Sequence, residues 1–303
     1  MVELDDIIPG KKNQTKEKQP FDKQKWAAEK QQSRKAAYAL MDSTAEAICK
    51  DSPAFRVYLD VQTRFDRYSI GNALLVTAQK PKATQLKDYD AWKDAGTPVK
   101  KDEGSIVILE PGEQYSREDG SAGVAMKVKH VFDISQTSAE PEAQTTPQYD
   151  ERTLMKALIS RVTVEIEPVD TIPNPEVHEN AYFVPEHNTI YVRRNLETPQ
   201  LFRVLSKELA LADFAARTPN YSRSAKQFKA VCVSYMLMNK YGFDTKDFQI
   251  SVPSSYATKT AQDVRADLTE IREEAVSIMA RMSRALEPFK AQQKNETERQ
   301  EAR

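Results

Sequence analysis

Aromatic and cationic residues that could hold a nucleic-acid strand are scattered through residues 56–137. Aromatic side chains stack on bases, and Lys or Arg side chains pair with phosphates, so together they hold a single strand without reading its sequence. From residue 53 to residue 135, twelve Lys or Arg stand against twelve Asp or Glu, so any attraction for a polyanion must come from a local patch. The candidates are Arg67, Tyr68, Lys80, Lys82, Tyr89, Trp92, Lys100, Lys101, Lys127 and Lys129.

Each of these candidates also has an ordinary structural interpretation. Tyr89 and Trp92 could fill a protein core, and Lys100-Lys101 could be a solvated pair in a loop. The first turn of the helix expected after Ser69 could present N–H groups to an anion, or it could be a simple helix cap. The residues alone leave these interpretations open.

Patterns for other chemistry are missing from the sequence. His130, His178 and His187 are the three histidines, and no two of them are spaced as a metal-binding pair on one helix. Neither GxxxxGK[ST] nor GxGxxG occurs, which disfavours a phosphate-binding loop. No local Ser-His-Asp or Cys-His arrangement is visible. Cys49 and Cys232 fall within helical patterns, so we expect buried free thiols.

Length and composition indicate a soluble protein. The chain has 303 residues, 40% hydrophobic and 29% charged, with a formal net charge of −1, which allows two domains with real cores. The first ten residues are acidic rather than signal-like, and no run approaches the 18 apolar residues of a membrane span. We therefore expect a cytoplasmic protein with no membrane partner.

Helical and strand patterns in the first half would position the candidates. Residues 1–34 are polar and rich in Lys and Gln, which predicts a disordered arm. The most apolar helical segment begins after Ser69, a good N-cap, and stops before Pro81. Other helices are predicted from about Trp26 or Lys35 through Ile48, from Pro53 through Phe65 and over 86–96, with strands at 105–111 and 124–135 around a polar loop at 112–122.

A linker rich in Pro, Thr and Glu at 138–150 precedes the second half. The fold class is then α+β with two domains, 35–137 and 151–290, each with a few helices and a small antiparallel sheet. Residues 291–303 read as a charged tail. In the second half the patterns predict a helix from Glu151, a strand at 162–167, a β-hairpin over 180–194 turning at 185–188, and helices over 199–216, 222–241 and 261–289.

Three blocks, YSIGNALLVTAQKPKAT, DYDAWKDAGTPVKKDEGSIVILEP and VFDISQT, resemble the N-terminal domain of ArdC-type antirestriction proteins. The sequence departs from that pattern at Asp102, where the family usually has Gly. The resemblance covers roughly residues 35–140 and implies a single-stranded DNA-binding domain of a plasmid, phage or conjugative-element protein. The matching residues are Tyr68, Ser69, Asn72, Leu75, Trp92, Val99, Lys101, Ile106, Ile108, Leu109, Phe132, Asp133, Ser135, Gln136 and Thr137.

The same resemblance implies a degenerate metal site in the second half. The family has a zincin-like metalloprotease fold there, with two His of an H-E-x-x-H helix holding zinc and the Glu activating water. In this chain Lys207 and Leu211 stand where those histidines belong, Val231 stands at the third ligand position, and Glu208 remains. The resemblance therefore implies a fold without its metal ligands and without a cofactor. We expect Glu208 to pair with Lys207 or a neighbouring Arg.

These inferences predict a non-catalytic single-stranded DNA-binding protein of a mobile element, with a pseudo-metalloprotease domain as scaffold or partner surface. Two other functions stay open. One is a protein-interaction module directed at a host restriction or conjugation protein, without DNA binding. The other is a hydrolase with a rebuilt metal site. The predicted DNA contacts are Arg67, Tyr68, Asn72, Lys80, Lys82, Trp92, Lys100 and Lys101.

Overall fold

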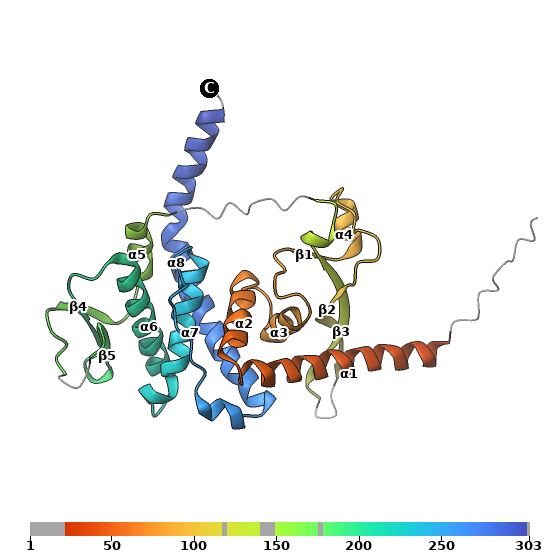
Figure 1. Ribbon diagram of the computed structural model, residues 1–303, viewed down its shortest axis with the longest axis horizontal. Helices are drawn as coiled ribbons and strands as arrows, with labels where there is room; N and C mark the ends of the chain where they lie inside the picture. Colours follow the sequence, from red (N-terminus) through yellow and green to blue (C-terminus); the bar gives the residue numbers. More distant parts are fainter. Residues whose placement is uncertain (1–21, 117–119, 140–148, 175–177, 302–303) are drawn as a thin grey trace, which may run out of the picture.

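The structure, a computed structural model, describes residues 22–116, 120–139, 149–174 and 178–301. Two three-stranded sheets lie on opposite sides of an elongated molecule, most of the helices lie between them, and α1 runs past the sheet of the first half (Figure 1). This mixture of helices and small sheets confirms the predicted α+β class. Most of the predicted linker, 140–148, lies outside the described residues.

Helices occupy the predicted positions of the first half, but two begin elsewhere. Helix α1 begins at Lys23, inside the predicted disordered arm, because the Asp22 carboxylate caps it by accepting two backbone N–H groups. Residues 1–21 of that arm lie outside the described part of the chain. Helix α4 begins at Tyr89 rather than at residue 86, because the Asp88 side chain caps it there. The helices are α1 (Lys23–Ile48), α2 (Ser52–Arg64), α3 (Ile70–Gln79) and α4 (Tyr89–Asp94).

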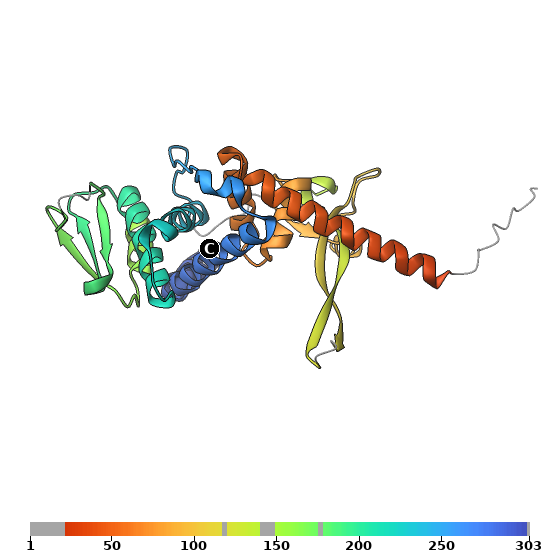
Figure 2. The same cartoon turned by 90° about the horizontal axis from the view of Figure 1, so that it is seen from below.

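The sheet of the first half is antiparallel, in the order β1-β3-β2. It consists of β1 (Leu86–Lys87), β2 (Ile106–Ser116) and β3 (Ala122–Asp133). Both long strands continue into the stretch predicted as a polar loop at 112–122, because their pairing resumes after a register shift between Pro111 and Gln114. The resulting hairpin projects well beyond the body of the molecule (Figure 2).

The second half has a mixed sheet rather than the predicted antiparallel one. β5 and β6 form the predicted hairpin around a turn at 185–188, but β4 runs parallel to β6. Helix α8 also continues past residue 289 into the predicted tail. The elements are α5 (Glu151–Leu158), β4 (Glu165–Val169), β5 (Ala181–Val184), β6 (Thr189–Arg193), α6 (Thr198–Arg217), α7 (Arg223–Lys240) and α8 (Ala261–Glu301).

Buried residues of both halves join into one continuous core. Arg56 of α2 donates to the Tyr235 hydroxyl of α7 at 3.1 Å, and that hydroxyl donates to Asp60. Arg272 of α8 donates to the main-chain oxygen of Tyr68, just before α3, at 2.7 Å. The two predicted domains are therefore packed together around a shared interior.

Two further sequence predictions concern buried groups and membrane spans. Cys49 and Cys232 are both buried and free, as predicted. Burial raises the pKa of the Cys49 thiol to about 11, with the Asp267 carboxylate acting in the same direction. Within the described ranges, no helix is long and apolar enough to cross a bilayer.

Candidate functional site

Two amide side chains of α3 hold the outer edge of β2. An edge strand leaves alternate N–H and C=O groups without strand partners. Asn72 donates to the Leu109 carbonyl and accepts from the Leu109 N–H, both at 2.8 Å. Gln79, two helical turns later, makes the same pair of bonds with Val107, at 2.9 and 2.8 Å. Both polar atoms of Asn72 are thus bound to main chain, which makes it a positioning residue for the sheet.

The block FDISQT forms a bracket that fixes two loops. The buried Asp133 carboxylate accepts N–H groups from Thr84 at 2.7 Å and Gln85 at 3.0 Å. The side-chain amide of Gln136 donates to the main-chain carbonyl of Gly104 at 2.7 Å. The main-chain carbonyl of Gln136 accepts a hydrogen bond from the Lys100 N–H at 2.9 Å. Asp133 and Gln136 also cap each other. The loop after α3 and the loop before β2 are therefore held on one short segment.

Burial alone would raise the pKa of Asp133. Hydrogen bonds from Ser135, Thr84 and Gln85 outweigh this effect and leave the pKa of Asp133 below its usual value. The carboxylate form is therefore the one that holds the bracket together. A charged, fully hydrogen-bonded carboxylate of this kind is a structural feature rather than an exposed ligand-binding group.

Three of the cations predicted to meet phosphate lie on the two loops that this bracket fixes. Lys82 precedes Thr84 in the first fixed loop, and Lys100 and Lys101 lie in the second; all three are exposed. Arg67 is exposed on the α2–α3 connection, and Lys80 is half-buried. None of the five pairs with a carboxylate within the described ranges. In contrast, Lys127 pairs with Glu110, and Lys129 with Glu110 and Asp88.

The aromatic candidates divide into buried and exposed side chains. Trp92 is 2% exposed and donates its indole N–H to the Phe132 carbonyl at 2.8 Å, so it belongs to the core and presents no face for a base. Tyr68 is half-buried and stacked on Phe65, with ring centroids 5.2 Å apart. Tyr89 is 54% exposed and remains available for stacking.

Asp102, the departure from the family pattern, has φ +64°. Glycine adopts this left-handed backbone conformation without penalty, and Asp is among the few other residues that tolerate it. The loop that carries Lys100 and Lys101 therefore keeps the turn that glycine would favour.

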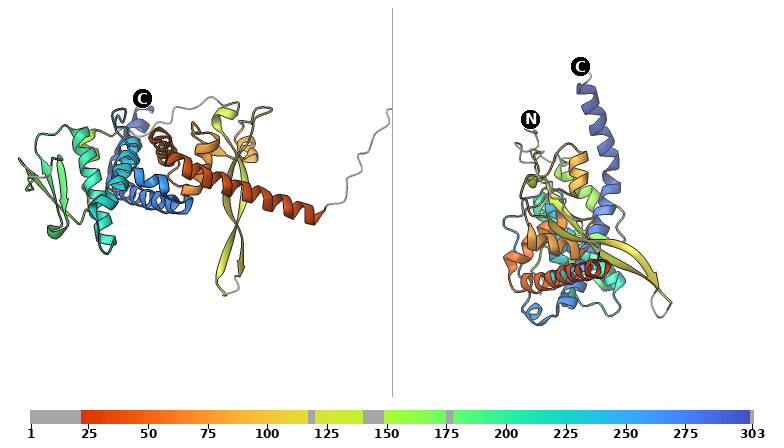
Figure 3. Two further views of the ribbon diagram at one scale, coloured as in Figure 1. Left: turned by 60° about the horizontal axis from the view of Figure 1, so that its bottom comes forward. Right: turned by 90° about the vertical axis from the view of Figure 1, so that its right-hand side faces the viewer.

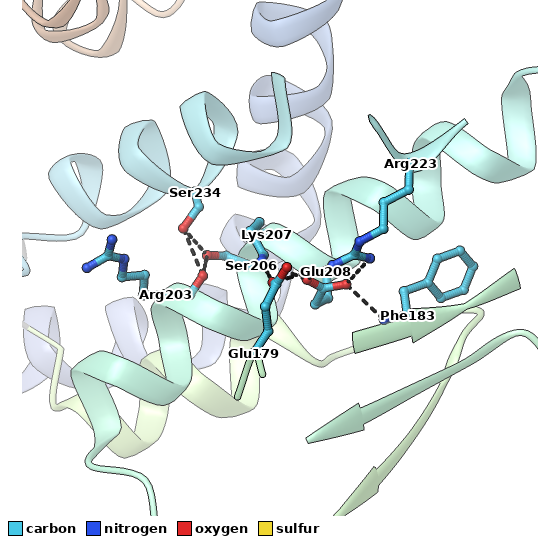
Figure 4. Close-up of polar contacts among 8 residues, drawn as sticks. All are labelled: Glu179, Phe183, Arg203, Ser206, Lys207, Glu208, Arg223 and Ser234. Carbon is cyan, nitrogen blue, oxygen red and sulfur yellow. Dashed lines mark hydrogen bonds and ion pairs between the residues drawn. The ribbon is translucent and has the colours of Figure 1, made fainter. Parts of the chain in front are cut away.

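In the second half, Glu208 of α6 is fully buried in a cluster of charges (Figure 4). Arg223, the first residue of α7, donates one hydrogen bond to each carboxylate oxygen of Glu208, both at 2.8 Å. The Phe183 N–H, on the edge strand β5, donates to the same carboxylate at 2.8 Å. Lys207 lies 3.0 Å from it. The predicted pairing of Glu208 with Lys207 or a neighbouring Arg is confirmed.

Glu179 completes the cluster by pairing with Lys207 and Arg223. Burial raises the pKa of Glu179, but the hydrogen bond and charge of Lys207 and the charge of Arg223 outweigh it and leave the pKa lowered. Burial lowers the pKa of Arg223, but the hydrogen bonds and charge of Glu208 outweigh it and leave the pKa raised. The cluster is therefore two carboxylates neutralised by two cations.

This arrangement does not fit a zinc ion. Lys207 uses its ammonium on carboxylates, Leu211 is fully buried and offers no lone pair, and Val231 offers none either. His178 and His187 are exposed, and His130 hydrogen-bonds to Ser105 instead. No group of three or more His, Cys, Asp or Glu in the described ranges could hold a metal. Both carboxylate oxygens of Glu208 accept hydrogen bonds from other protein groups.

A cavity of about 640 Å³ opens beside the charge cluster. The Arg223 guanidinium lies over the Tyr182 ring, 4.1 Å from its centroid, and both residues line the cavity with Tyr221 and His187. Burial raises the pKa of Tyr221 to about 12, so this hydroxyl is neutral. The cavity offers neutral aromatic surface next to a cation that is already paired.

Sequence reasoning did not identify Arg223 or the role of Gln79. Arg223 lies fifteen residues from Glu208 on another helix, so no local spacing reveals the pair. Gln79 could have been found, since it follows Asn72 by seven residues on the same side of α3.

The fold is similar to that of a solved antirestriction protein of the ArdC type. The Mn(II)-bound crystal structure of the antirestriction ArdC protein from the R388 plasmid matches with a TM-score of 0.50, at 16% identity, over 71% of this chain and 85% of that chain. The metal-free crystal structure of that protein gives a TM-score of 0.49, at 16% identity, over 72% and 86%. No family model and no curated protein matches the sequence. The likeness agrees with the fold implied by the sequence blocks.

Proposed function

We propose that this chain is an antirestriction protein of the ArdC type, encoded on a plasmid or a similar mobile element, and that its first half binds single-stranded DNA. The ArdC-like fold and the family blocks support this proposal. The observation that carries it is the bracket of Asp133 and Gln136, which fixes the loops bearing Lys82 and Lys100-Lys101 next to one segment.

Rigid placement matters because phosphate binding by flexible lysines costs side-chain and loop entropy. Here the loop after α3 is fixed from two sides, by Asp133 and by Arg64, which donates to the Ala83 carbonyl at 3.1 Å. Lys82, Lys100 and Lys101 have no carboxylate partner among the described residues, and the Lys100 ammonium donates to the Ser135 carbonyl. Cations on fixed loops meet phosphates at little further ordering cost. Lys80 and the exposed Tyr89 would extend this surface, with Asn72 and Trp92 supporting it from behind. Arg67, which precedes α3, would be a separate contact.

The second half would act as a non-catalytic scaffold or as a surface for a host restriction or conjugation protein. Glu208, the residue that a metalloprotease would use as general base, has its carboxylate bound by Arg223, Lys207 and the Phe183 N–H. The mechanism is then occupancy: the protein shields a transferred strand, or places a partner on it.

Fluorescence anisotropy of a labelled single-stranded oligonucleotide at two salt concentrations tests the proposal. We expect binding that weakens as salt rises, because phosphate contacts release counterions. Lys100→Ala/Lys101→Ala should weaken it several-fold. The matched control is Arg194→Ala/Lys246→Ala, which removes two exposed cations of the second half and should leave binding unchanged.

Absence of binding at low salt would refute the DNA-binding proposal and leave a protein-interaction module. Equal loss in both double variants would show that general charge, rather than the bracketed loops, attracts the strand.

A further inference from the structure

The N-terminal half of α1 is exposed to solvent. Residues 22–33 are all exposed, whereas Ala37 and Met41 further along are buried. Figure 2 shows this part of α1 standing clear of the body and running away from the point where α1 meets the projecting β2–β3 hairpin. An isolated helix of this length is only marginally stable in water and gains stability when it packs against a partner. This solvated helical arm is therefore a candidate binding element.

One face of this arm carries cations and a tryptophan. Spacings of three, four and seven residues place side chains on the same side of a helix. The face continues the stripe that is buried at Ala37. Its four residues are Lys23, Trp26, Lys30 and Arg34.

Two contacts order side chains of this face. Arg34 donates to the Met126 carbonyl of β3 at 3.4 Å, where the hairpin crosses α1 (Figure 3). The Lys30 ammonium lies 3.7 Å from the centre of the Trp26 ring, which is 43% exposed. Val124, two residues from Met126 and on the same face of β3, is 46% exposed. The crossing therefore joins a cationic helix face to an exposed apolar strand face.

The positive charge of residues 23–35 indicates what kind of ligand this face binds. Residues 23–35 hold five cations and a single carboxylate, Glu29, in a molecule whose net charge is −1. None of these five cations pairs with a carboxylate in the part of the chain that the structure describes. The arm is thus a local positive patch on a slightly negative protein, so a polyanion is attracted here.

We propose that the face formed by Lys23, Trp26, Lys30 and Arg34 is a second contact surface for single-stranded nucleic acid. This inference rests on the proposed DNA binding and assigns it a place outside the bracketed loops. From Lys23 to Arg34 the face spans about 16 Å, comparable with about five stacked nucleotides. Trp26 offers a flat surface to an unpaired base, which a duplex does not present.

A membrane surface is a poorer match. Helices that lie on bilayers need a broad apolar face. Trp26 is the single large apolar side chain between residues 23 and 35.

Two charge-matched double variants test the proposal on the full chain. Lys23→Gln/Lys30→Gln removes two cations from the proposed face, and Lys25→Gln/Lys35→Gln removes two from other faces of the same helix. With a labelled single-stranded oligonucleotide, we expect the first variant to reduce the slope of log K against log salt by about 1.4, because each phosphate contact contributes about 0.7. The control should change it far less. Circular dichroism checks that both keep wild-type helix content.

Fluorescence gives an independent readout. The chain has two tryptophans, and Trp92 is buried, so quenching by unlabelled oligonucleotide should come from Trp26 and vanish in Trp26→Phe. Poly-glutamate and a duplex of the same sequence serve as competitors and should displace the single strand poorly.

Equal effects of the two double variants, or stronger binding of duplex or poly-glutamate, would overturn this assignment. If the wild-type chain binds and only Lys100→Ala/Lys101→Ala weakens binding, the arm is excluded and the proposed function stands. If the wild-type chain does not bind, the proposed function itself fails.

Discussion

The Arg223 guanidinium and the Glu208 carboxylate form two parallel hydrogen bonds of 2.8 Å in the interior of the second half. This bidentate geometry is among the strongest that charged side chains adopt. It gives the buried Glu208 carboxylate a cationic partner. Together with the Phe183 N–H, which donates to the same carboxylate, the pair joins α6, α7 and β5.

Removal of one partner of this pair should be costly. Arg223→Ala leaves the Glu208 charge buried with fewer partners, and we expect the free energy of unfolding to fall by about 3 to 5 kcal/mol. Urea denaturation measures it. Arg194→Ala, which removes an exposed partner of Asp170, should cost less than about 1 kcal/mol. Similar decreases in the free energy of unfolding in the two variants would show that the Arg223–Glu208 pair stabilises the fold no more than an exposed ion pair.

Metal content should be low. Lys207, Leu211 and Val231 provide no ligand set, so purified protein should contain no stoichiometric zinc or manganese, and chelation should not shift its melting temperature. Elemental analysis after dialysis against trace zinc measures this. One zinc per chain would contradict the scaffold interpretation and restore the hydrolase alternative.

The Asn72 amide should matter for stability. Asn72→Ala leaves the N–H and C=O of Leu109 without their partners, and we expect a loss of about 1 to 3 kcal/mol. Asn72→Asp keeps the acceptor for the Leu109 N–H but places an oxygen against the Leu109 carbonyl, so it should also destabilise. Oligonucleotide affinity at a temperature where the variants stay folded should be nearly unchanged. A large loss of affinity without loss of stability would instead make Asn72 a direct DNA contact.

The free energy of unfolding should fall at acid pH as Asp133 becomes protonated. Its folded pKa lies below the unfolded value of about 3.9, so its contribution is complete above that value and is lost as pH falls through the folded pKa. The difference in unfolding free energy between wild type and Asp133→Asn should be constant from about pH 5 to pH 8 and shrink below about pH 4. A difference that stays constant into that acid range would show that the bracket does not depend on ionised Asp133.

Asp102→Gly should stabilise the loop. The φ of +64° is free for glycine and unfavourable for Asp, so we expect a gain of up to about 1 kcal/mol, reduced by the larger unfolded-state entropy of glycine. Thermal unfolding measures it. Lys101→Gly serves as control, because Lys101 does not have positive φ, and it should not stabilise.

Local patterns predicted much of the fold. The cap at Ser69, the turn at 185–188 and the burial of Cys232 follow from short-range rules, and all three are found. The parallel pairing of β4 with β6 was not predicted, because nothing in a five-residue strand specifies its direction.

The candidate site could be predicted from the sequence less well than the fold. The alternatives for Trp92 could be separated only by the contact of its indole with Phe132, forty residues away. The basic face of α1 was hidden by an overall composition that resembles a disordered segment. Asn72 and Asp133, which carry part of the family resemblance, proved to hold the backbone in place, so the match reports architecture more than ligand contacts.

The shared interior around Arg56, Tyr235 and Asp60 has a consequence for how the chain can be divided. If the chain were cut between residues 139 and 149, the two pieces could still associate through the same contacts. These are the contacts of α2 with α7 and the hydrogen bond from Arg272 to the main-chain oxygen of Tyr68. Such fragments should complement each other when co-expressed, as in a split reporter, and each should be poorly soluble alone. The two halves would then have to evolve together. Replacing one half with that of a distant relative would require new contacts between the halves.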